Sequence, residues 1–96
     1  MLGAKSRAGR LMDEITKAIG AYRACIGDLP DDVTDDELKR EAETMLHHAR
    51  DGSSLMSLKG DIANGLANRI RVTSLRNDDC VRLANALLEL ANTPRP

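Results

Sequence analysis

The stretch 77–92 constrains the fold most, because its apolar residues cover more than half of a helical surface. If the stretch is helical, two adjacent seams form on it, and they contain Leu83, Leu87, Leu88 and Leu90. An ordinary surface helix has an apolar arc of roughly 100° or somewhat more. A wider arc has to be covered from two sides. We therefore expect this helix to be central, and its four leucines to lie in the core or in an interface between two copies of the chain.

The composition favours helices packed on helices. The chain has 96 residues, with no Phe, no Trp and a single Tyr, so its core must be built from aliphatic residues, methionine and alanine. A chain of this size buries roughly 60–65% of its unfolded surface, and self-association is a common way to increase burial. We expect an all-α fold in which residues 1–96 form a single domain. The domain is a compact bundle of about four short helices, homodimeric through its C-terminal helix.

Capping residues and apolar spacing set the predicted bounds of the first two helices. The first helix runs from about residue 6 to residue 26, after a flexible segment at 1–5. The second has the clearest start, because Thr34 and Glu37 have the spacing of a capping box. Gly52 follows its last turn and is typical of a helix end.

The third and fourth helices are predicted with less regular ends. The third begins near Ser53 or Ser54, and residues 69–74 alternate between polar and apolar types, so they are either helical or a short extended piece. Asn77 is the predicted N-cap of the last helix. Residues 93–96 form a flexible tail.

Charge is distributed unevenly along the chain, although the formal net charge is only −1. Residues 28–43 contain eight acidic and two basic side chains. Part of this run is explained by helix capping and by the helix dipole, and a solvated loop would account for the rest. The functional interpretation is an acidic surface that binds a basic protein partner, for example one that normally holds nucleic acid. Its residues are Asp31, Asp32, Asp35, Asp36 and Glu37.

A basic group supports a different interpretation. Arg69, Arg71, Arg76 and Arg82 lie near the third and fourth helices, and a dimer that pools them would bind nucleic acid as a transcriptional regulator. The apolar positions do not fit the register of a helix-turn-helix, and Tyr22 is the only aromatic residue that could stack on a base. Nucleic-acid binding is therefore the alternative interpretation.

Catalytic, metal and membrane functions have no support in the sequence. The adjacent His47 and His48 would point about 100° apart on a helix, too far to chelate one ion, and the acidic run lacks the spacing of a calcium-binding loop. No phosphate-binding loop, nucleophile motif, signal peptide or membrane-spanning run is present. Cys25 and Cys80 are expected to be buried, reduced thiols. We expect a cytoplasmic protein without enzymatic activity, metal, cofactor or membrane contact.

These features together favour a small non-catalytic regulator that binds a protein partner and modulates or inhibits it. An adaptor, an antiactivator and an inhibitor of a host complex encoded by a phage or mobile element all have this profile. The association rests on size, charge segregation and the wide apolar helix, and no motif identifies a family.

Overall fold

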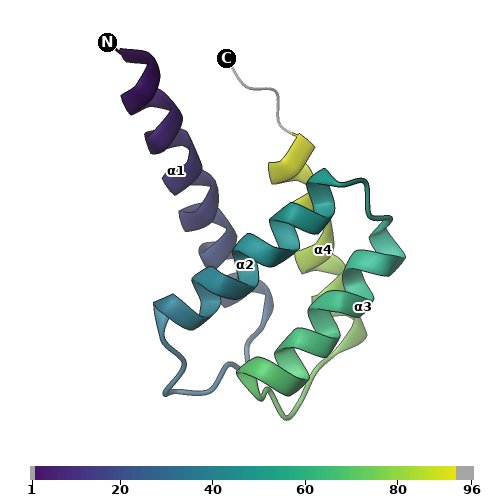
Figure 1. Ribbon diagram of the computed structural model, residues 1–96. Helices are drawn as coiled ribbons and strands as arrows, with labels where there is room; N and C mark the ends of the chain where they lie inside the picture. The colour runs from purple at the N-terminus through teal and green to yellow at the C-terminus, as the bar shows by residue number, and fades with distance from the viewer. Residues whose placement is uncertain (1, 93–96) are drawn as a thin grey trace.

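The computed structural model describes the backbone of residues 2–92 and the side chains of residues 13–92. Within this range it contains four α-helices and no strand: α1 (Leu2–Cys25), α2 (Asp35–Arg50), α3 (Leu55–Gly65) and α4 (Asn77–Asn92). A π-helix, η1 (Leu66–Ile70), continues α3 directly. Figure 1 shows that α1 and α4 run in opposite directions. The predicted all-α fold is confirmed for the described residues, although α1 is longer than expected.

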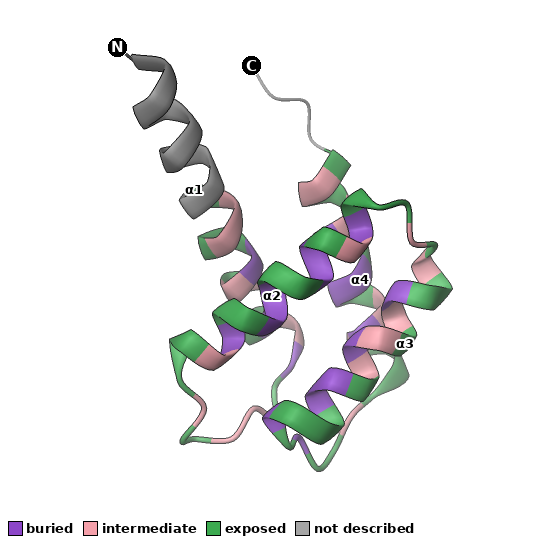
Figure 2. Cartoon of the chain, in the orientation of Figure 1, coloured by how far each residue is buried: buried purple, intermediate pink, exposed green. Residues whose placement is uncertain are grey.

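Helix α4 is the central element of the fold. It packs against α1, α2 and α3, and each of these helices contributes to one core, shown by the buried positions in Figure 2. Leu83 and Leu87 are fully buried in that core. Leu88 and Leu90 are half-buried and pack against its edge. The apolar arc of α4 is therefore wider than the part that the other helices cover completely.

The core consists mainly of aliphatic side chains, as the composition requires. On α1, the first fully buried residue among those with described side chains is Ala18. None of the described helices is long and apolar enough to cross a lipid bilayer. The largest fully buried side chains are Tyr22, Leu38, Met45, Leu46, Leu58, Ile62, Leu66, Leu83 and Leu87.

The predicted bounds of α2 are confirmed. The Thr34 hydroxyl accepts a hydrogen bond from the Glu37 N–H at 3.2 Å, and the Glu37 carboxylate accepts one from the Thr34 N–H at 3.0 Å, which completes the capping box. At the other end, Gly52 adopts a φ of 93° and donates its N–H to the Ala49 carbonyl. The N–H of Ser53 donates to the His48 carbonyl, so the helix ends in a Schellman motif.

The start of α1 and the N-cap of α4 differ from the prediction. Helix α1 begins at Leu2, about four residues earlier than predicted, and residues 93–96 lie outside the described part. Asn77 is already helical, and the carbonyl of Arg76 accepts the hydrogen bond of the Cys80 N–H. The Asn77 side chain instead accepts a hydrogen bond from Lys59 Nζ at 2.8 Å. A contact with α3 has thus replaced the predicted local cap.

Residues 69–74 are neither a strand nor a continued α-helix. Residues 69 and 70 belong to η1, and Arg71 ends it in the left-handed conformation with a φ of 67°. Residues 71–76 then form an irregular connection to α4. This connection, called the 71–76 connection below, places Arg71 and Arg76 on the surface.

Two glycines of α3 should respond differently to replacement by alanine. A Cβ at Gly60 would meet nothing within 4 Å, so we expect Gly60→Ala to stabilise the protein by about 0.5–1 kcal/mol through helix propensity. A Cβ at Gly65 would lie 2.6 Å from Arg69 Nη2 and in collision with the Glu41 carboxylate. We expect Gly65→Ala to show no such stabilisation, because the Glu41 and Arg69 side chains would have to move to admit the methyl group. Urea unfolding measures both values, and an equal gain would show that the Glu41 and Arg69 side chains move away without cost.

Candidate functional site

The acidic surface lies on the connection between α1 and α2 and on the first turn of α2. Asp31 and Asp32 belong to the connection, whereas Asp35, Asp36 and Glu37 belong to the helix. All of them are exposed except Glu37, which is half-buried. The sequence places these residues together because the run is short and the capping box fixes where the helix begins.

Two of the five acidic residues have structural roles. Glu37 completes the capping box, and Asp35 accepts a hydrogen bond from Arg23 of α1 at 2.5 Å. Both members of this ion pair are exposed, so it contributes roughly 0–1 kcal/mol. Within residues 13–92, no basic side chain pairs with Asp31, Asp32 or Asp36. These three carboxylates are therefore exposed and have no basic partner within that range.

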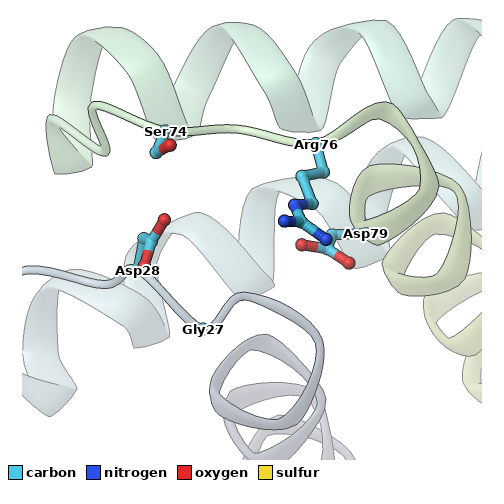
Figure 3. A pocket seen from close by; sticks show the side chains of 5 residues that line it. All are labelled: Gly27, Asp28, Ser74, Arg76 and Asp79. Carbon is cyan, nitrogen blue, oxygen red and sulfur yellow. The ribbon is translucent and has the colours of Figure 1, made fainter.

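A polar pocket of about 240 Å³ connects the α1–α2 connection to the start of α4. Figure 3 shows the Arg76 guanidinium beside the Asp79 carboxylate, while Asp28 lies across the pocket from them, opposite Ser74. Pockets for drug-sized ligands usually measure roughly 300–1,000 Å³. This pocket is therefore smaller than a typical site for a drug-sized ligand.

The four arginines of the alternative interpretation have different neighbours. Arg69 on η1 pairs with Glu41 of α2, and Arg76 lies beside Asp79 in the pocket. Arg71 and Arg82 are exposed. Arg82 lies on α4, where its charge opposes the upward effect of burial on the pKa of Cys25 in α1. Carboxylates accompany two of these arginines, and the four do not share one set of contacts.

The buried ion pair of Glu41 and Arg69 is not predicted by any motif in the sequence. Glu41 is 4% exposed, and its carboxylate accepts hydrogen bonds from Arg69 Nε and, at 3.2 Å, from Arg69 Nη2. Glu41 lies three residues after Leu38 and four before Met45, both buried. An acid on the apolar face of a helix was the signal that could have identified it.

Tyr22 of α1 lies beside this ion pair. Its hydroxyl is buried and has no hydrogen-bond partner among residues 13–92. Burial raises the pKa of Tyr22 well above its ordinary value of 10.0, and the charge of Glu41 raises it further. The hydroxyl therefore stays protonated in the folded chain. Tyr22, Glu41, Gly65 and Arg69 bring α1, α2, α3 and η1 together around one buried charge.

Both cysteines are free thiols, with Cys80 buried and Cys25 half-buried. Burial raises the pKa of each above its ordinary value of 9.0. The thiols of the unfolded chain therefore ionise at a lower pH than those of the folded chain. Their contribution to stability is present below about pH 9 and is lost as the pH rises.

The His47 Nε2 atom lies 3.4 Å from Oδ2 of Asp51, which is four residues further along the chain.

No three His, Cys, Asp or Glu side chains in the described part of the chain are grouped as metal ligands would be. Comparison with protein-family models, with curated proteins and with solved structures finds no match to this chain.

Proposed function

We propose that this protein is a small non-catalytic regulator that binds a protein partner through its acidic surface and modulates or inhibits that partner. The observation that carries the proposal is the group of three exposed carboxylates, Asp31, Asp32 and Asp36, that no basic side chain of residues 13–92 neutralises. An adaptor, an antiactivator or a phage or mobile-element inhibitor of a host complex would use such a surface.

Within residues 13–92, the side chains of Asp31, Asp32 and Asp36 form no ion pair. The capping box already supplies the side-chain contacts at the start of α2, and Asp31 and Asp32 precede it in the connection. Mutual repulsion between neighbouring carboxylates is unfavourable unless a cation approaches them. A basic partner surface, such as one that normally binds nucleic acid, would relieve this repulsion and be attracted over a distance. Binding should accordingly weaken as salt is added.

We also propose self-association through α4, supported by the half-buried Leu88 and Leu90 at the edge of the core. A cytoplasmic location is consistent with two unpaired cysteines. The nucleic-acid-binding alternative has less support, because using Arg69 would require separating it from a buried carboxylate.

The test is the simultaneous replacement of Asp31, Asp32 and Asp36 by lysine. We expect the triple variant to lose the partner in an affinity pull-down from the native cytoplasm, because attraction becomes repulsion, while its helical circular-dichroism signal is unchanged. The pull-down is run with and without nuclease. A stoichiometric protein that remains after nuclease treatment supports the proposal, and co-elution that depends on nucleic acid supports the alternative.

A matched control reverses three other exposed acids, Asp13, Glu43 and Asp78. It changes the net charge by the same amount, and Asp78 occupies the first turn of α4 as Asp36 occupies that of α2. We expect the control to retain the partner. Equal binding by both variants would show that the acidic surface is not the contact, and equal loss would show that only net charge matters.

A further inference from the structure

The π-helix η1 is the least regular element of the described backbone. Its five residues continue α3 without a break, and π-turns are rare and often occur at functional sites. The turn closes at the Leu66 carbonyl, which accepts the N–H groups of both Arg71 and, at 2.8 Å, Val72. Arg71 is the only described non-glycine residue with a positive φ, a conformation that costs free energy.

Local sequence does not explain why the helix widens here. Residues 66–70 contain neither glycine nor proline, and leucine, alanine and arginine are good α-helix formers. The reason lies in the tertiary contacts. Leu58, Ile62, Leu66 and Ile70 follow one another in steps of four, and all are buried. In an α-helix each such step overshoots a full turn by roughly 40°. In a continued α-helix Ile70 would therefore be rotated away from the core. The wider π-turn returns Ile70 to the buried face.

Gly65 and Arg69 are also four residues apart, and this spacing places both of them beside Glu41. Gly65 has no side chain and so leaves room for the Glu41 carboxylate. Arg69 donates two hydrogen bonds to the same carboxylate. Glu41 belongs to α2 and is almost fully buried, so its charge needs a partner. The Arg69 side chain is 53% exposed and spans the distance from this carboxylate to the solvent. The pair thus fixes the rotation of η1 relative to α2.

We propose that the Glu41–Arg69 pair is a conformational latch that holds η1 in its π form and so fixes the 71–76 connection. This connection begins directly after the latch, at the left-handed Arg71, and supplies Ser74 and Arg76 to the polar pocket. The burial of Ile70 and the Arg69–Glu41 pair both favour the wide turn. Release of Arg69 removes the second of these contacts, so the turn is held less firmly and the connection loses its fixed starting point. The latch couples a buried charge to the shape of a surface pocket.

The test is amide hydrogen exchange in the full chain, measured residue by residue by NMR for the Glu41→Gln variant. We expect the Arg71 and Val72 amides to exchange at least tenfold faster than in the unmodified chain, because both donate to the Leu66 carbonyl at the end of the π-turn. Amides in the middle of α2 and α4 should keep their exchange rates. Unchanged rates at both positions, or equal acceleration in all helices, would overturn the proposal.

Two further variants keep the test decisive. Arg69→Lys retains the positive charge but cannot form the paired hydrogen bonds, so it should also accelerate exchange at Arg71 and Val72 and is the measurement to use if the Glu41 variant does not fold. Asp35→Asn breaks the exposed pair with Arg23 and is the matched control. It should leave exchange at Arg71 and Val72 unchanged, and acceleration there would mean that losing any ion pair has this effect.

Discussion

Leu87→Ala is expected to lower the free energy of unfolding by roughly 2–5 kcal/mol. Leu87 is 0% exposed and lies on the helix that packs against α1, α2 and α3. A cavity at this position is enclosed by more than one element, so no single helix can move to fill it. Because small domains are stable by only about 5–15 kcal/mol, this is a large fraction of the total. Urea unfolding followed by circular dichroism measures the change.

Leu88→Ala is the matched control, since it makes the same chemical change at a neighbouring, half-buried position. It should cost less than Leu87→Ala at low protein concentration. If α4 forms the proposed dimer interface, the cost of Leu88→Ala should increase with protein concentration. A loss below ~1 kcal/mol for Leu87→Ala would contradict the central position of α4.

Arg69→Leu should cost about 3 kcal/mol, because it leaves the buried Glu41 carboxylate without its partner. This value is the lower end of the range for buried pairs, since Arg69 is itself half exposed and its loss admits some water. Adding Glu41→Met should recover most of the loss, because an apolar pair often replaces a buried ion pair at little cost. Urea unfolding at neutral pH measures both variants. A single-variant loss as small as that of an exposed pair, below ~1 kcal/mol, would contradict the burial of Glu41.

The sequence predicted those parts of the fold that depend on neighbours in the chain. The capping box of Thr34 and Glu37 spans three residues, and the apolar spacing of α4 repeats within one helix, so both could be recognised directly. The acidic surface was predictable for the same reason. The Arg23–Asp35 pair was not, because it joins two helices across a separation of 12 residues.

The Glu41–Arg69 pair and η1 show the physical limit of sequence-based prediction here. The paired residues are 28 positions apart, so the position of Glu41 on the apolar face of α2 does not by itself indicate which residue pairs with it. The π-turn follows from where Leu66, Ile70 and Arg69 must lie in the assembled fold. Helix propensity is a weaker influence, amounting to less than about 1 kcal/mol per residue for these types. Tertiary packing therefore determined both the end of α3 and the displacement of the N-cap from Asn77.

The π-turn also marks the position at which this helix can change its length. Elsewhere in an α-helix, deleting one residue rotates everything beyond it by roughly 100° and separates the two parts of a buried stripe. Between Leu66 and Ile70, the loss of the exposed Ala67 would convert a spacing of four into a spacing of three, and an α-turn keeps both residues on one face. A relative that is one residue shorter here could preserve the same core. Gaps in an alignment of such chains would be expected at η1, inside a continuous helix, as well as in the connections.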